Sequence, residues 1–103
     1  MAEFIKVAKV SEVPPGKSKL IDLGGLQIAL FNVGGRCFAI NDMCTHAGGS
    51  LSEGDVDGTT VECPLHGARF DLITGQVLNP PAEDDVATYK VHIEGEDIMI
   101  EVG

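Results

Sequence analysis

The sequence predicts an all-β domain of antiparallel strands, and three observations lead to this prediction. The apolar stretches are short and are separated by glycine and proline. Two Gly-Gly pairs stand between strand-like stretches, and a two-residue hairpin turn favours glycine because it needs positive φ. No stretch repeats apolar residues at the 3.6-residue spacing of a helix. The 103 residues fit a single domain, since domains typically hold about 100–150 residues.

The first half of the chain alternates strand-like stretches with turn residues. We expect strands at Phe4–Val10, Lys19–Leu23, Leu26–Val33 and Arg36–Asn41. Pro14 and Pro15 end the first strand, because proline cannot donate a ladder hydrogen bond. Gly24-Gly25 and Gly34-Gly35 then connect the next three strands as two hairpins.

The second half carries shorter strand-like stretches and one candidate helical turn near Ser50–Gly54. We expect strands at Thr60–Glu62, Arg69–Leu72, Gln76–Leu78, Ala87–Ile93 and Asp97–Val102. The last two strands form a hairpin across Glu94–Glu96, and Asn79-Pro80-Pro81 makes a rigid break. Residues 43–70 are richer in glycine and polar side chains, so we interpret them as the part that carries the chemistry.

Composition and charge exclude several classes of function. No apolar run approaches the roughly 18 residues that a membrane span needs, and charged residues interrupt Met1–Val10. We therefore expect no membrane anchor and no signal peptide, and we expect a cytoplasmic location. Sixteen acidic against seven basic residues give a net charge of −9, which argues against nucleic acid as a partner. The same charge fits attraction to a basic patch on a protein partner or simple solubility, and it does not distinguish the two.

Two short motifs combine the residue types that bind metals. Cys44-Thr45-His46 is a C-x-H motif, Cys63-Pro64-Leu65-His66 is a C-x-x-H motif, and sixteen residues separate His46 from Cys63. Glycines follow both motifs, and glycine-containing loops can aim backbone N–H groups at inorganic sulfur. Two thiolates and two imidazoles also suit tetrahedral zinc, but common zinc sites pair Cys with Cys and His with His. Mixed pairs favour a two-iron core in which each loop gives one ligand to each metal, and zinc stays the alternative.

The segment from Cys44 to Pro81, CTHAGGSLSEGDVDGTTVECPLHGARFDLITGQVLNPP, resembles the cluster-binding region of Rieske ferredoxins that serve bacterial aromatic-ring-hydroxylating dioxygenases. The resemblance implies one Rieske-type [2Fe–2S] cluster, with Cys44 and Cys63 on the inner iron and His46 and His66 on the outer one. It also implies a Rieske-type fold: one domain over 1–103, with a sandwich- or barrel-like base (1–42 and 82–103) and a cluster-binding subdomain of two loops (43–81).

The sequence departs from the Rieske proteins of respiratory complexes, which carry an extra disulfide and two hydroxyl donors near the cluster. Those residues would fall at Gly49, Leu65, Ala68 and Phe70, where the sequence has neither cysteine, serine nor tyrosine. Because hydroxyl donors stabilise the reduced cluster, we predict a midpoint potential near the bottom of the Rieske range of roughly −150 to +300 mV.

The function implied by the resemblance is one-electron transfer by a monomer, from a flavin-containing NAD(P)H reductase to a terminal oxygenase. A small subunit of a nitrite reductase and a zinc-binding interaction module are the alternatives. An oxygenase itself needs a second iron site, commonly with two histidines. Only His92 remains after the cluster takes two of the three histidines, so we expect an electron carrier and not an enzyme. Outside the motifs, we expect Cys37 to be a packed strand residue, His92 to face solvent and Glu83–Asp85 to be a solvated loop.

Overall fold

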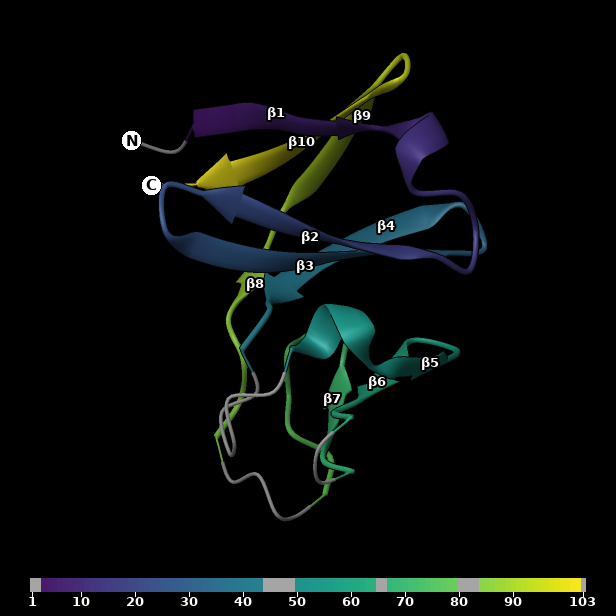
Figure 1. Cartoon of the computed structure of the whole chain (residues 1–103), viewed down its shortest axis with the longest axis vertical. Helices are drawn as coiled ribbons and strands as arrows, with labels where there is room; N and C mark the ends of the chain where they lie inside the picture. The colour runs from purple at the N-terminus through teal and green to yellow at the C-terminus, as the bar shows by residue number, and fades with distance from the viewer. Residues whose placement is uncertain (1–2, 44–49, 65–66, 80–83, 103) are drawn as a thin grey trace.

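The computed structural model describes residues 3–43, 50–64, 67–79 and 84–102, and it confirms an all-β fold with antiparallel pairing. Three sheets are stacked along the long axis of the molecule (Figure 1). Of the four predicted cluster ligands, Cys44, His46 and His66 lie outside the described residues. None of the helical segments in the described ranges is long and apolar enough to cross a membrane.

The sheet at one end of the molecule, here called the terminal sheet, pairs the two ends of the chain. Its order is β1 (Glu3–Lys9), β10 (Asp97–Val102), β9 (Val91–Glu94). A short 3₁₀ turn, η1 (Val10–Glu12), follows β1. The predicted hairpin between the last two strands is confirmed for β9 and β10, with Gly95 at a φ of 62° in the turn.

The central sheet has the order β2 (Ser18–Leu23), β3 (Leu26–Val33), β4 (Arg36–Asn41), β8 (Thr88–Tyr89). Strands β3 and β4 have the predicted bounds. Gly24 and Gly25 have φ values of 62° and 98°, and Gly34 and Gly35 have 60° and 95°. Both pairs therefore form the predicted hairpin turns, because positive φ at both central positions is the conformation that glycine favours.

The small sheet contains β5 (Asp55–Asp57), β6 (Thr60–Glu62) and β7 (Arg69–Asp71), and one 3₁₀ turn, η2 (Leu51–Glu53), precedes it. The turn lies where the sequence predicted one. Strand β5 was not predicted: all three of its residues are exposed, and aspartate is depleted in strands, so nothing in its composition indicates a strand.

Two predicted strands were wrong in part. Gln76–Leu78 is reduced to an isolated bridge between Val77 and Phe70, and the Val77 N–H donates to the Asp85 carboxylate. Ala87–Ile93 is two strands, since the chain leaves β4 after Tyr89 and joins β10 at Val91. The alternating pattern continues through Lys90, so the sequence alone does not show the change of sheet.

Strand β3 is buried on both faces and joins the two parts of the core. Ile28 and Leu30 belong to a cluster that includes Ile98 and Ile100 of the terminal sheet. Phe31, which points to the other face, belongs to a second cluster that packs against the small sheet. The second cluster contains Ala29, Phe31, Ile40, Leu51, Val61, Cys63, Ala68, Phe70, Leu72 and Val86. The central sheet thus packs against the terminal sheet on one face and against the described part of the predicted cluster-binding segment on the other.

Candidate metal centre

A buried carboxylate joins the described residues on either side of the segment 44–49, which contains the predicted ligands Cys44 and His46. Met43 and Ser50 form an antiparallel bridge. Asp42, only 3% exposed, accepts hydrogen bonds from the Ser50 hydroxyl (2.7 Å) and the Ser52 N–H (2.8 Å). The Leu51 N–H donates to the Asp42 carbonyl at 2.7 Å. A buried carboxylate is tolerated when it is well hydrogen-bonded, and here its bonds hold residues 50–52 next to Asp42.

The second motif lies in the turn between β6 and β7. Cys63 directly follows β6 and is completely buried. Its N–H donates to the Ala68 carbonyl at 2.7 Å, and the Gly67 N–H donates to the Cys63 carbonyl at 3.1 Å. Gly67 has a φ of 74°, which glycine adopts without the strain that a Cβ would cause.

The described part of the site fits an iron–sulfur cluster. Cys63 stands at the end of a strand, in a tight glycine-containing turn, at the edge of an apolar cluster that includes Ala68 and Phe70. Cys63 is therefore shielded from water in the described structure. The described residues that flank the three segments 44–49, 65–66 and 80–83 lie in the half of the molecule opposite the terminal sheet (Figure 1).

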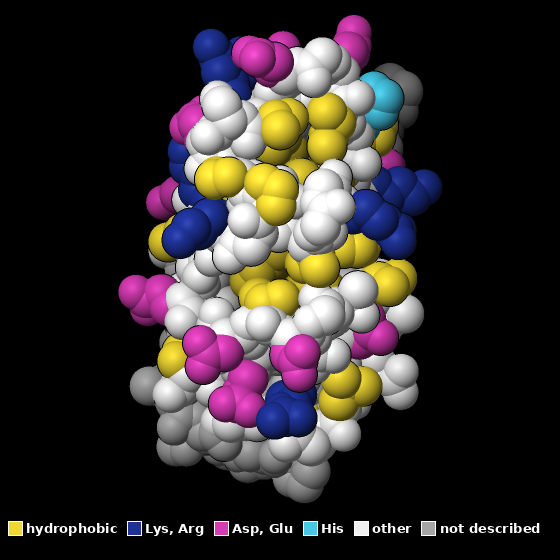
Figure 2. All heavy atoms as spheres, turned by 90° about the vertical axis from the view of Figure 1, so that its right-hand side faces the viewer, with side chains coloured by type: hydrophobic (Ala, Val, Ile, Leu, Met, Phe, Trp, Pro, Cys, Tyr) yellow, Lys and Arg dark blue, Asp and Glu magenta, His cyan; other side chains and the backbone are white. Residues whose placement is uncertain are grey.

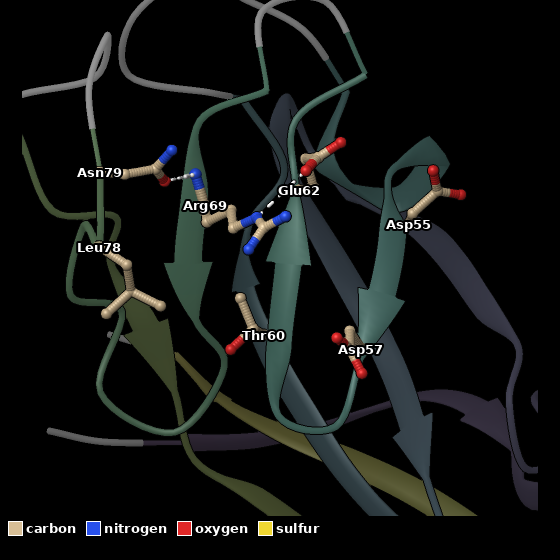
Figure 3. Close-up of a pocket in the computed structure, with 7 residues that line it drawn as sticks. All are labelled: Asp55, Asp57, Thr60, Glu62, Arg69, Leu78 and Asn79. Carbon is tan, nitrogen blue, oxygen red and sulfur yellow. Dashed lines mark hydrogen bonds and ion pairs between the residues drawn. The ribbon is translucent and has the colours of Figure 1, made fainter.

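A shallow hollow lies beside this turn, on the outer face of the small sheet, with a volume of about 480 Å³. Figure 3 shows Asp55, Asp57, Thr60, Glu62, Arg69, Leu78 and Asn79 around it. Arg69 donates through Nε to Glu62 at 3.1 Å, and both side chains are partly exposed. In the space-filling view, acidic side chains surround a basic one on the lower part of this face (Figure 2). No local sequence pattern marks these residues, because they come together only through the register of β5, β6 and β7.

Cys37 and His92, which we expect to have no part in the metal site, lie on strands outside the small sheet. Cys37, on β4, is half-buried against the cluster between the terminal and central sheets, and loss of solvent around the thiol raises its pKa above the ordinary value. His92, on β9, is exposed, with its ring 5.8 Å from that of Phe4 and Nε2 3.9 Å from a Glu94 carboxylate oxygen. Both predictions for these residues are confirmed.

The family comparison agrees with this architecture. Residues 3–90 match the model of the Rieske [2Fe–2S] domain. The chain belongs to the Rieske [2Fe–2S] family. Its cofactor is accordingly a [2Fe–2S] cluster, and the zinc alternative is wrong.

Relatives of this Rieske chain include ferredoxin components of oxygenase systems. The 3-phenylpropionate/cinnamic acid dioxygenase ferredoxin subunit of Escherichia coli K12 is 52% identical over 99 residues, covering 95% of this chain and 92% of the relative. A solved complex of reduced oxygenase and oxidized ferredoxin in carbazole 1,9a-dioxygenase contains a chain that is 32% identical, with a TM-score of 0.88, covering 94% of this chain and 91% of that one.

A second similar structure, from Mycobacterium tuberculosis, is described as an NADH-dependent nitrite reductase small subunit. It has a TM-score of 0.89 and covers 100% of this chain and 97% of that one, but only 22% of the residues are identical. At this identity the similarity shows the fold alone, so it does not favour the nitrite reductase alternative.

Proposed function

We propose that this Rieske protein is the one-electron carrier of a dioxygenase system, which takes electrons from an NAD(P)H-dependent flavin reductase and passes them to a terminal oxygenase. The observation that carries the proposal is the 52% identity to a dioxygenase ferredoxin subunit along nearly the whole of both chains. The similarity to a chain of an oxygenase–ferredoxin complex supports a terminal oxygenase as partner.

In this proposal Cys44 and Cys63 hold the inner iron, and His46 and His66 hold the outer iron. When bound, the cluster supplies reversible uptake of a single electron. The complete burial of Cys63 supports its assignment to the inner side. His46 and His66 would hold the iron that exchanges electrons with the partner proteins.

The position of His92 supports a carrier and not an oxygenase. This third histidine lies on β9 of the terminal sheet, at the end of the molecule away from the small sheet (Figure 1). A two-histidine, one-carboxylate iron site would need a second histidine beside it. The monomeric state, the cytoplasmic location and the subdomain boundary at 43–81 stay predictions.

Chemical analysis of the freshly isolated protein tests the proposal first. We expect two irons and two acid-labile sulfides per chain, a red-brown colour and an electron paramagnetic resonance signal only after reduction. Stopped-flow mixing with a flavin reductase and then a terminal oxygenase should show the cluster reduced by the first and reoxidised by the second. A protein without iron and sulfide, or one that neither partner type reduces or oxidises, contradicts the proposal.

Substitution of the histidines tests the ligand assignment. His66→Cys or His46→Cys replaces a neutral ligand by a thiolate, which makes the core more negative and harder to reduce. We expect each variant to have a lower midpoint potential or to assemble no cluster. His92→Cys is the matched control and should behave as the parent protein. An assembled His66→Cys variant with an unchanged potential would refute the assignment.

A further inference from the structure

The backbone pairing along β7 stops two residues short of the turn that contains Cys63. Phe70 and Val77 form a bridge, and the Leu78 N–H donates to the Arg69 carbonyl at 2.8 Å. The next residue, Asn79, precedes Pro80, which has no N–H and restricts the backbone before it. A further backbone hydrogen bond from position 80 to the turn is therefore impossible.

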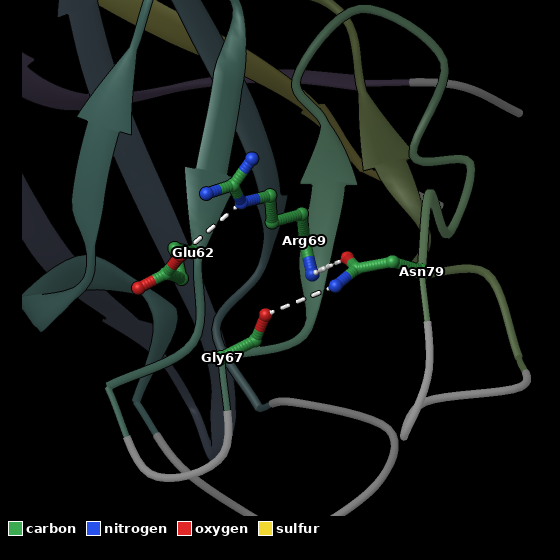
Figure 4. A network of polar contacts seen from close by, with 4 residues as sticks. All are labelled: Glu62, Gly67, Arg69 and Asn79. Atoms are coloured by element: carbon green, nitrogen blue, oxygen red, sulfur yellow. Dashed lines mark hydrogen bonds and ion pairs between the residues drawn. The ribbon is translucent and has the colours of Figure 1, made fainter.

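The side chain of Asn79 continues the pairing where the backbone cannot. Its Oδ1 accepts a hydrogen bond from the Arg69 N–H at 2.8 Å, and its Nδ2 donates to the Gly67 carbonyl at 3.3 Å (Figure 4). A primary amide carries one carbonyl acceptor and N–H donors, so it offers the same groups as a peptide unit. Asn79 thus adds one more pair of hydrogen bonds to the ladder, in the direction of the turn.

These bonds reach the turn at the residue that closes it. Gly67 donates its own N–H to the Cys63 carbonyl, and the Cys63 N–H donates to Ala68. On the other side of β7, the Arg69 side chain bonds to Glu62, the residue before Cys63 (Figure 4). Asn79 bonds to Gly67 and to Arg69, and so it holds both ends of the three-residue segment that leads from the turn into β7.

We propose that Asn79 is a positioning residue for the cluster, because it fixes the turn between Cys63 and Gly67 by acting as a substitute peptide unit. The proposal rests on the proposed ligation by Cys63 and His66, since it concerns the turn that carries them. It predicts that loss of the Asn79 amide changes the environment of the cluster more than it changes the stability of the fold.

Asn32 provides a matched control in the central sheet. Its Nδ2 donates to the Val13 carbonyl at 2.7 Å and its Oδ1 accepts from the Gly35 N–H at 2.9 Å, so it also joins two backbone segments. Asn32 is 4% exposed, whereas Asn79 is half-buried, so the loss of Asn32 should destabilise the fold at least as much.

The experiment compares Ala and Asp substitutions at both positions in the cluster-loaded protein. Asn79→Ala removes both hydrogen bonds. Asn79→Asp keeps an acceptor for the Arg69 N–H but loses the donor to the Gly67 carbonyl and adds a negative charge, and Asn32→Asp adds the same charge in the central sheet. The measurements are the rate of iron release to a chelator well below the melting temperature, the paramagnetic resonance spectrum of the reduced protein, and the melting temperature by circular dichroism.

We expect both Asn79 variants to release iron about tenfold faster, as the loss of one or two modest hydrogen bonds predicts, and to give a shifted or broadened resonance spectrum. The Asn32 variants should lower the melting temperature while leaving iron release and the spectrum unchanged. Asn79→Ala protein that folds but takes up no cluster, beside Asn32→Ala protein that does, would also support the proposal.

Two results would overturn the positioning role: parent-like iron release and spectra in both Asn79 variants, or equal changes in the Asn32 variants. A parent protein that itself lacks iron and sulfide would instead contradict the proposed function, so the two failures are distinguishable.

Discussion

Substitution of Gly75 by alanine should destabilise the protein through two separable effects. Gly75 has a φ of 76°, and a Cβ at this position would overlap the Val86 carbonyl oxygen and lie 2.9 Å from Thr88 Cγ2. The approach is close because the Val86 N–H donates to the Gly75 carbonyl at 2.9 Å. This bond brings together the two ends of the segment 76–85 and places Val86 in the apolar cluster that contains Cys63.

The magnitude follows from two controls that each isolate one effect. Gly58 has a φ of 61° but no atom within 4 Å of a Cβ, so Gly58→Ala should cost only about 1–2 kcal/mol of backbone strain. Gly54 has an ordinary φ of −76°, but its Cβ would overlap the Glu62 carbonyl oxygen, so Gly54→Ala should cost about 1–3 kcal/mol. Gly75→Ala combines both effects and should cost about 2–5 kcal/mol.

Thermal unfolding followed by circular dichroism at one scan rate measures these differences. In a domain of this size, 1 kcal/mol shifts the melting temperature by about 4–8 °C. We expect Gly75→Ala to lower it about twice as far as Gly58→Ala, with earlier bleaching of the cluster absorbance. Equal melting temperatures for Gly75→Ala and Gly58→Ala would refute the close approach of residues 75 and 86.

Three further predictions concern redox chemistry, partner docking and thiol reactivity. A redox titration should give a midpoint potential near the lower end of the range of roughly −150 to +300 mV. Ala68→Ser adds a hydroxyl next to the turn and should raise the midpoint potential. A clearly positive midpoint potential in the parent protein would contradict the first expectation. Asp55→Asn and Asp57→Asn, on the exposed strand β5, should slow electron transfer with the partner protein more at low salt than at high salt. Glu96→Gln, in the terminal sheet, should not slow it. Equal slowing by the β5 variants at both ionic strengths would contradict electrostatic steering by this strand. Desolvation raises the pKa of Cys37, so alkylation of this thiol by iodoacetamide should be slow at pH 8 and faster at higher pH. The contribution of the neutral thiol to the free energy of unfolding should be lost as the pH rises through the raised pKa. Alkylation at pH 8 as fast as in the unfolded chain, with the Cys37→Ser variant as blank, would contradict this.

Local features of the fold were predictable because they depend on neighbours in the chain. The Gly-Gly pairs at 24–25 and 34–35 fix two hairpin turns; β3 and β4 have the predicted bounds, and β2 begins one residue earlier than predicted. Alternation along β4 correctly placed Cys37 against the core, and alternation along β9 correctly placed His92 in solvent.

The misses share a physical cause, which is pairing between residues far apart in the chain. Strand β5 exists because it pairs with β6, although aspartate disfavours strands. The change of sheet at Lys90 depends on where β4 and β10 lie, and the alternation on either side is the same. Val77 bridges to Phe70 of β7 and donates its N–H to the Asp85 carboxylate, and no local pattern indicates either contact.

The sequence by itself determined the chemistry: the mixed Cys and His motifs favoured a two-iron core over zinc, the resemblance to Rieske ferredoxins implied a [2Fe–2S] cluster, and the family match agrees. The positions of the four ligands stay a prediction from those motifs. Only the tertiary structure decided what supports the described residues next to the segments 44–49 and 65–66, from the burial of β3 on both faces to the bonds of Asp42 and Asn79. The reason is that residue type and spacing select a metal, whereas the groups that support its loops come from segments that meet only in the folded chain.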